Sequence, residues 1–227
     1  FYVLISLVAE YPNKVQTLAQ SHEVAFHGDI HTSFRDLPEA VQRERLERMQ
    51  AQMAAVLPLE KTTPGFRAPT EGYDETTERL LAEKGFTHHL ADPHRTDARL
   101  PLFAGERGPT RQLVVLPRTN RDDINLLNEG GTDAVAMAQR LEDELALVEA
   151  QGALGILSVH TQHFGETNPL AAAVSLFLHD LAARRETVWL ASSGQVTDWW
   201  KARDRVRVVT RDLGLRAEFD LSVAEGA

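Results

Sequence analysis

Two histidines four residues apart, His27 and His31, are the first residues of this chain whose types and spacing indicate chemistry. On a helical segment this spacing places both imidazoles on one face, where they can share a divalent metal ion, most often zinc. They follow a strand candidate at Val24–Phe26, and ligand sites in parallel α/β folds gather after strands. Asp29 lies between them and is expected to point away, so we do not count it as a third ligand. The alternative is a pair of solvated histidines, since the chain has nine.

Two further segments each carry one candidate polar side chain. In Gly65-Phe66-Arg67-Ala68-Pro69 the proline restrains the loop, and an arginine held there can bind a carboxylate through two hydrogen bonds. Taken alone, this segment is better interpreted as a surface loop with a solvated arginine. Residues 155–160 predict a buried strand ending in His160, which can act as general acid or base near neutral pH. The alternatives are a core histidine bound to a backbone carbonyl, and a catalytic role for His163 instead.

Short apolar segments alternate with helical patterns along the chain. This alternation predicts an α/β fold with crossover helices and a parallel sheet, closed or open. A capping box at Asp36–Glu39 is expected to begin a helix that ends at Pro58. Other helices are expected at residues 13–20, 74–85, 132–152, 170–184 and 196–203. Asp74 is expected to cap the second of these, and Gly152 to end the third. Predicted strands cover residues 1–8, 23–26, 87–91, 112–116, 154–159, 187–190, 205–210 and 215–221.

The composition limits the class of protein. Of 227 residues, 43% are hydrophobic and 25% charged, which is typical of globular chains with a sizeable core. The absence of cysteine excludes disulfides, thiolate zinc sites and a cysteine nucleophile. A formal charge of -9 disfavours nucleic acid as a partner, and no apolar run has the length of a membrane helix. Because Phe1 falls inside a strand candidate, we expect further sequence upstream.

Three segments follow one another along the chain: His-Gly-x-x-His, Arg-x-Pro and an apolar strand that ends in histidine. In this order they resemble the motifs of the polysaccharide deacetylase family (NodB-homology domain, carbohydrate esterase family 4). The opening residues 1–4 and the segment 21–27 share this likeness, which extends over residues 1–203 and includes the ending Trp199-Trp200-x-x-Arg203. The resemblance implies a distorted (β/α)7-type barrel whose N-terminal strand is missing from this chain. A β extension over residues 204–227 would follow it.

The resemblance also implies roles for individual residues. His27 and His31 would hold the metal, and His160 would protonate the leaving amine as general acid. Arg67 would orient the carboxylate that acts as general base. The residues expected to contact substrate are Leu157, which would line a pocket for the acetyl methyl group, Pro69 and Asp92.

Two departures from the family pattern affect these expectations. The adjacent aspartates that supply the general base and the third metal ligand in the family do not precede the first strand here, so we expect them upstream of Phe1. The Asp-Asp pair of this chain, Asp122-Asp123, lies far downstream, where the family has no metal role for it. We interpret it either as part of a substrate loop or as a helix cap. Ser158 stands where the family often has leucine.

The resemblance therefore implies a metal-dependent hydrolase, with zinc as the expected cofactor, that removes N-acetyl or O-acetyl groups from a carbohydrate outside the cytoplasm. The expected partner is an acetylated glycan, with residues 95–128 forming a wall of its site; neither nucleic acid nor a membrane segment is expected. Without the upstream aspartates, this chain alone is expected to be inactive. Two alternatives stay open: a non-catalytic carbohydrate-binding module on the same fold, and an amidase or deformylase acting on a non-sugar amide.

Overall fold

The computed structural model describes residues 1–91, 100–105, 108–118, 122–129, 133–165, 168–212 and 217–223. Asp92, one of the expected substrate contacts, lies outside these residues.

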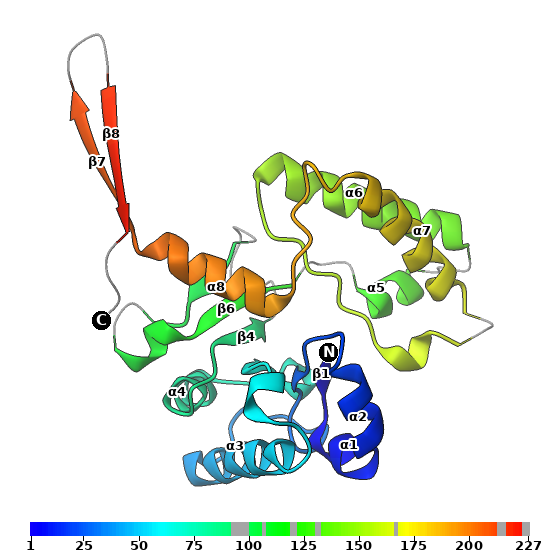
Figure 1. Ribbon diagram of the computed structural model, residues 1–227. Coiled ribbons are helices and arrows are strands. Elements are labelled where there is room, and N and C mark those ends of the chain that lie inside the picture. Colours follow the sequence, from blue (N-terminus) through cyan, green and yellow to red (C-terminus); the bar gives the residue numbers. More distant parts are fainter. Residues whose placement is uncertain are drawn as a thin grey trace.

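A six-stranded sheet forms the centre of the N-terminal part of the chain (Figure 1). Its order is β1-β2-β3-β4-β6-β5, and its pairings are parallel except the one between β5 and β6. The strands are β1 (Tyr2–Val3), β2 (Ala25–Phe26), β3 (Gly65–Arg67), β4 (His88–Ala91), β5 (Leu102–Phe103) and β6 (Val114–Pro117). The predicted α/β class with a parallel sheet is therefore confirmed, and the described strands pair in an open order.

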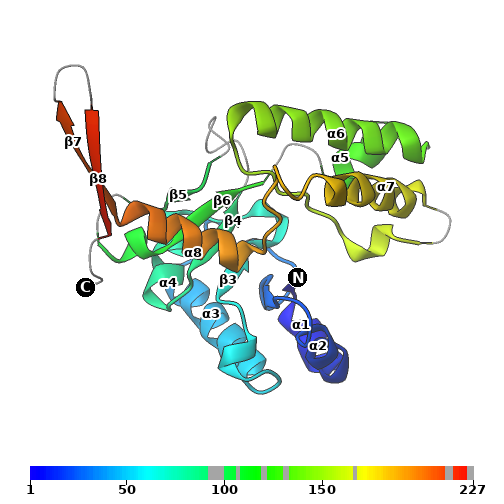
Figure 2. The same ribbon diagram turned by 45° about the horizontal axis from the view of Figure 1, so that its top comes forward.

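Helices cover both faces of this sheet (Figure 2). The main core lies on one face and includes the fully buried Met49, Phe66 and Leu81. Its helices are α1 (Ile5–Glu10), α2 (Pro12–Leu18), α3 (Glu39–Ala54) and α4 (Glu75–Glu83). On the other face, α8 (Ser193–Asp204) packs Val196 against Leu90. Because side chains alternate along a strand, β4 supplies residues to both faces.

A second group of helices lies beside the sheet. These are α5 (Asp123–Asn128), α6 (Ala134–Gln151) and α7 (Pro169–Ala183), which share a hydrophobic cluster of their own. The predicted helix 132–152 ends at Gly152 as expected, and the backbone of this glycine is left-handed with φ 58°. No helix in the described part of the chain is long and apolar enough to cross a membrane.

The C-terminal strands form a separate antiparallel pair, β7 (Val206–Asp212) and β8 (Ala217–Val223). The hairpin projects away from the rest of the chain (Figure 1). The division of the chain at residue 203 into a barrel domain and an extension stays a prediction.

Three predicted strands are wrong in whole or in part. Residues 1–8 form a strand only at Tyr2–Val3 and then turn into α1, because a short apolar run does not distinguish a buried strand from a buried helix. Residues 154–159 and 187–190 are described without strand pairing. Leu154 and Ile156 instead pack against the cluster that contains Leu90, so their apolar pattern reflects contact with the sheet rather than membership of it.

The predicted capping box at the start of α3 is also wrong. The helix begins after Pro38, and no side chain caps it. Asp36 has a left-handed backbone with φ 63°, and its N–H donates to Oδ2 of Asp74 at 3.0 Å. Asp74 does cap α4 as predicted, accepting a hydrogen bond from the N–H of Thr77.

Candidate active site

The first two candidate ligands follow β2, at the carboxyl end of the sheet. Residues 27–31 form a turn, whereas the four-residue spacing of the histidines predicted a helical segment. Gly28 makes this turn with φ +90°, and a Cβ at this position would lie 2.6 Å from the ring of Pro69. Only glycine therefore fits without strain, and the turn brings the rings of His27 and His31 to a centroid distance of 5.3 Å.

The tautomer of His27 is set by a backbone contact. Its Nδ1 lies 2.9 Å from the carbonyl oxygen of Arg67, so Nδ1 carries the proton and Nε2 is left as an acceptor. Burial lowers the pKa of His27 to about 4, with the hydrogen bond to Arg67 opposing this shift. The imidazole is therefore neutral at pH 7, the form that binds metal ions.

Asp29 is turned toward α3, away from the histidines, as its position between them predicted. It is buried and pairs with Arg45 at 2.7 Å and with Arg48. Burial alone would raise the pKa of Asp29, but the hydrogen bonds from Arg45 and Arg48 lower it. Arg45 also donates to the carbonyl oxygens of Ser33 and Thr32, so this arginine fastens the loop that carries His31.

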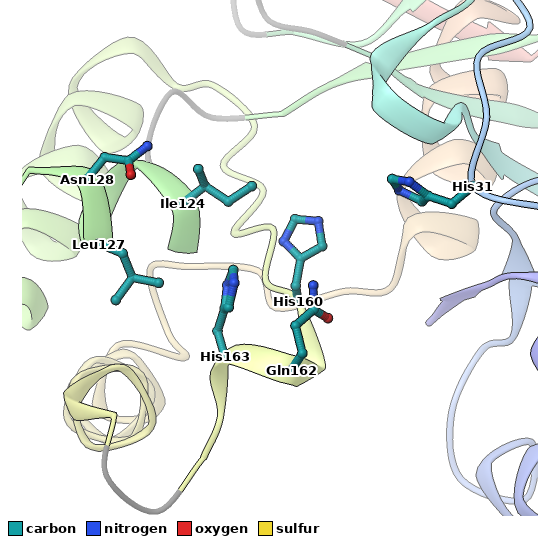
Figure 3. A pocket seen from close by; sticks show the side chains of 7 residues that line it. All are labelled: His31, Ile124, Leu127, Asn128, His160, Gln162 and His163. Carbon is teal, nitrogen blue, oxygen red and sulfur yellow. The ribbon is translucent and has the colours of Figure 1, made fainter.

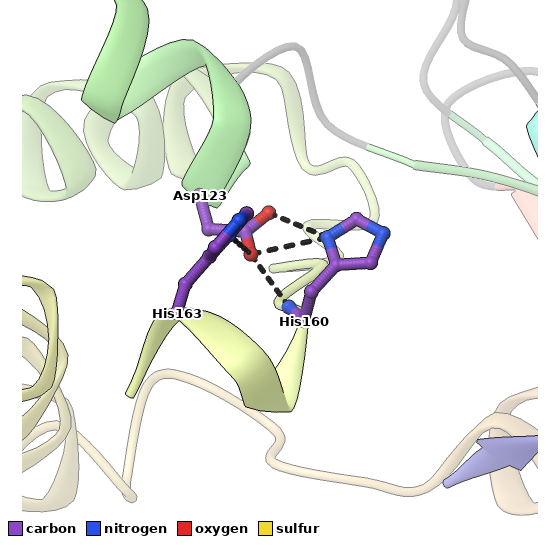
Figure 4. Close-up of side chains that lie close together, drawn as sticks. All are labelled: Asp123, His160 and His163. Carbon is purple, nitrogen blue, oxygen red and sulfur yellow. Dashed lines mark hydrogen bonds and ion pairs between the residues drawn. The ribbon is translucent and has the colours of Figure 1, made fainter. Parts of the chain in front are cut away.

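The third candidate, His160, is held by a buried carboxylate. Asp123, whose side chain is 0% exposed, accepts hydrogen bonds from the backbone N–H of His160 at 2.6 Å and from its Nδ1 at 3.0 Å. His163 contacts the same carboxylate through Nδ1 at 2.8 Å (Figure 4). Burial alone would raise the pKa of Asp123, but these hydrogen bonds lower it, so the carboxylate is ionised near neutral pH.

A cavity of about 420 Å³ joins the two groups of histidines (Figure 3). His31 lies on one side of it, and His160 and His163 lie on the other. The short helix α5 supplies apolar and amide side chains, so the end of the segment 95–128 faces this cavity. The lining residues are His31, Ile124, Leu127, Asn128, His160, Gln162 and His163.

Arg67 links the two sides of the site. Its carbonyl oxygen binds His27, while its guanidinium donates to Oγ of Ser158, two residues before His160. Among the described carboxylates, the one that it binds is Glu71, at 3.0 Å. Nε of Arg67 and Oε2 of Glu71 are buried without a hydrogen-bond partner among the described residues.

The two remaining substrate candidates lie apart from the cavity lining. Pro69 is buried and packs against Gly28, so it supports the turn between the histidines. Leu157 is partly buried and packs against the α6–α7 cluster. On this side of the cavity the apolar surface comes from Ile124 and Leu127 instead.

Asp123 is the site residue that sequence reasoning missed. Its neighbour Asp122 is the N-cap of α5, accepting from the N–H of Asn125, so the cap interpretation is confirmed for that residue. Asp123 instead turns toward His160, 37 residues away. Its position in the sequence could have indicated this role. Asp122-Asp123 follows a predicted parallel strand that ends at the same edge of the sheet as His27.

The polysaccharide deacetylase family model matches residues 1–89, so the resemblance seen in the sequence is confirmed there. The match includes His27, His31 and Arg67 and stops before Asp123 and His160. A comparison with curated proteins finds no match.

Three solved structures share the fold along most of the chain. A putative polysaccharide deacetylase from Mycobacterium smegmatis is 25% identical with a TM-score of 0.74, over 90% of this chain and 72% of that one. The PuuE allantoinase is 21% identical with a TM-score of 0.73, over 88% of this chain and 66% of that one. A probable polysaccharide deacetylase from Pseudomonas aeruginosa PAO1 is 19% identical with the same TM-score and the same coverage of both chains.

The residues present fit two positions of the zinc site that this family implies. His27 has the backbone contact at one ring nitrogen that typically orients a zinc-bound histidine, and its other nitrogen is free for an ion. His31 is close enough to share that ion. Within the described residues no third acidic, histidine or cysteine ligand joins this pair at metal-ligand spacing.

Proposed function

We propose that this chain carries the catalytic site of a metal-dependent deacetylase that hydrolyses the acetyl group of an acetylated carbohydrate. The observation that carries the proposal is the cavity that has His31, next to His27, on one side and the carboxylate-bound His160 on the other. The family match over residues 1–89 supports the same class of reaction.

The His27–His31 side of the cavity would bind the acetyl carbonyl. When held by these two imidazoles, a divalent ion supplies Lewis-acid polarisation of that carbonyl. Because burial keeps His27 neutral, its Nε2 is a ligand at pH 7 without first losing a proton.

His160 would move the proton in this reaction. Asp123 binds its Nδ1, so Nε2 is the nitrogen left to donate a proton to the leaving amine or alkoxide. The ionised carboxylate stabilises the imidazolium that must exist before this transfer, as in other histidine–carboxylate pairs. Such general acid catalysis typically contributes a factor of about 10²–10⁴ to the rate.

The cavity has features suited to an acetylated sugar. Ile124 and Leu127 offer apolar contacts for an acetyl methyl group, while Asn128 and Gln162 offer amide groups for hydroxyls. Its volume is within the range of small-ligand sites and suits one sugar unit.

The test is acetate release by the full-length protein from chitin oligomers, peptidoglycan and acetyl-xylan, with and without a chelator. His160→Gln should lower the rate by about 10²–10⁴-fold, because glutamine cannot donate a proton as imidazolium does. His179→Gln is the matched control, since His179 is exposed on α7. Full activity of His160→Gln, or no acetate from any glycan, would contradict the proposal.

The same panel should include a small non-sugar amide. One of the structures that share this fold is the PuuE allantoinase, so allantoin is the appropriate compound. Hydrolysis of allantoin with no release of acetate would replace the deacetylase assignment by the amidase alternative. Binding of glycans without hydrolysis of either substrate would favour the carbohydrate-binding alternative.

A further inference from the structure

A carboxylate and two imidazoles converge on one point beside the cavity. Asp123, His160 and His163 each place one ligand atom within 4.8 Å of the other two. Among the described histidine, aspartate and glutamate residues, these three form the group whose ligand atoms lie close enough together to bind one metal ion. The three residues come from α5 and from the single turn Thr161–His163 with the residue before it (Figure 4).

The distances within this group are close to those around a tetrahedral ion. Oδ2 of Asp123 lies 3.1 Å from Nδ1 of His160 and 2.8 Å from Nδ1 of His163. Zinc with ligand bonds of about 2.0–2.1 Å separates neighbouring ligand atoms by about 3.3 Å. An ion between the three atoms therefore requires shifts of only a few tenths of an ångström in these two distances.

The second imidazole has no evident use in positioning a general acid. One carboxylate oxygen is enough to orient His160, yet His163 binds the same group. Asp123 is fully buried, and the hydrogen bonds that it accepts lower its pKa, so it carries a negative charge at neutral pH. A divalent cation would neutralise it, and the adjoining cavity provides room for the ion to enter with its water.

We propose that Asp123, His160 and His163 form a second divalent-ion site that takes zinc and is separate from the His27–His31 pair. Each imidazole binds the ion through Nδ1 and keeps a proton on Nε2, so the proton that Nδ1 held moves to Nε2 of a neutral ring or, from an imidazolium, to solvent. The ion replaces the hydrogen bonds between Asp123 and both rings. Occupancy therefore removes the contact that prepares His160 for proton transfer, and excess zinc inhibits; this consequence rests on the proposed deacetylase function, whereas the binding itself does not.

The binding test uses the metal-free protein titrated with Zn²⁺ by calorimetry. Zinc binding should persist in His27→Ala, which disables the first pair, and should be lost or weakened at least tenfold when His163→Gln is added to it. His179→Gln serves as the control for loss of an exposed histidine. Binding that is absent in His27→Ala, or unchanged in the double variant, overturns the proposal.

A second measurement does not depend on the folding of any variant. Nitrogen-15 spectra of the histidine side chains should show that zinc shifts Nδ1 of both His160 and His163 in the unmodified protein. Zinc that leaves both Nδ1 resonances unchanged contradicts the site.

Activity separates this proposal from the proposed function. If the protein releases acetate, the rate should fall at the zinc concentrations that fill the second site, and a rate that stays constant there refutes inhibition. If calorimetry and spectra detect the second ion but no substrate is hydrolysed, the ion site stands and the deacetylase assignment fails.

Discussion

The ion pair between Asp29 and Arg45 is predicted to hold the His31 loop, and Arg45→Ala tests this directly. Both residues are buried, at 5% and 6% exposure, and their charged atoms are 2.7 Å apart. Alanine at position 45 removes this contact, the hydrogen bonds to two loop carbonyls and the stacking of the guanidinium on Phe34. The carboxylate of Asp29 then stays buried with Arg48 as its remaining cationic partner.

The expected cost follows from that burial. Removing one member of a buried ion pair lowers the free energy of unfolding by about 3–5 kcal/mol. Because Asp29 keeps its contact with Arg48, we expect a loss of about 3 kcal/mol for Arg45→Ala. For a chain of this length, each 1 kcal/mol lowers Tm by about 2–4 °C, so we expect a decrease of about 6–12 °C. Replacing both charges, as in Asp29→Ala with Arg45→Met, should recover part of this loss because no charge is left buried.

Thermal unfolding followed by circular dichroism measures these changes. Arg43→Ala is the matched control, since Arg43 lies on the same helix but pairs with Glu39 and Glu83 at the surface. It should lower Tm far less. The reasoning is refuted if Arg45→Ala unfolds at the same temperature as Arg43→Ala, or if the double variant is less stable than Arg45→Ala.

Three further predictions concern stability. Burial lowers the pKa of His88 to about 3, whereas the unfolded chain takes up that proton near pH 6.5, so stability should fall between about pH 6.5 and 3. His88→Gln should flatten the dependence of Tm on pH, and an equal slope contradicts the assignment. Gly65→Ala places a methyl group 2.1 Å from His88 and should cost about 1–3 kcal/mol in urea unfolding, unlike Gly165→Ala, which meets open space. Ser158→Ala removes the acceptor of a partly buried Arg67 N–H and should cost about 1–3 kcal/mol, and an unchanged stability contradicts that hydrogen bond.

The local signals in the sequence predicted local structure well. Asp74 before α4 and Gly152 after α6 act as expected, because a cap depends on residues within one turn of the helix end. The capping box at Asp36 failed because a tertiary contact, with Asp74, competes for its backbone. Residues 154–159 failed for a related reason, since burial against a sheet and pairing within a sheet give the same apolar pattern.

The candidate site was predictable in its residue types but not in its connections. The spacing of His27 and His31 and the position of His160 after an apolar segment were sufficient to select them. The contacts of His160 with Asp123 and of Arg67 with Ser158 span 37 and 91 residues, and no local pattern encodes them. Leu157 was selected by its distance from His160 along the chain, whereas the cavity is lined by Ile124 and Leu127 from another helix.

The most direct test of the catalytic assignment is chemical rescue of His160. His160→Gly should release acetate from an acetylated glycan about 10²–10⁴-fold more slowly than the unmodified protein, since the general acid is lost. Added imidazole should enter the cavity, occupy the vacated position beside Asp123 and restore part of the rate, with no such gain in the unmodified protein. An undiminished rate in His160→Gly would show that proton transfer does not pass through this histidine, and the account of the site would be wrong.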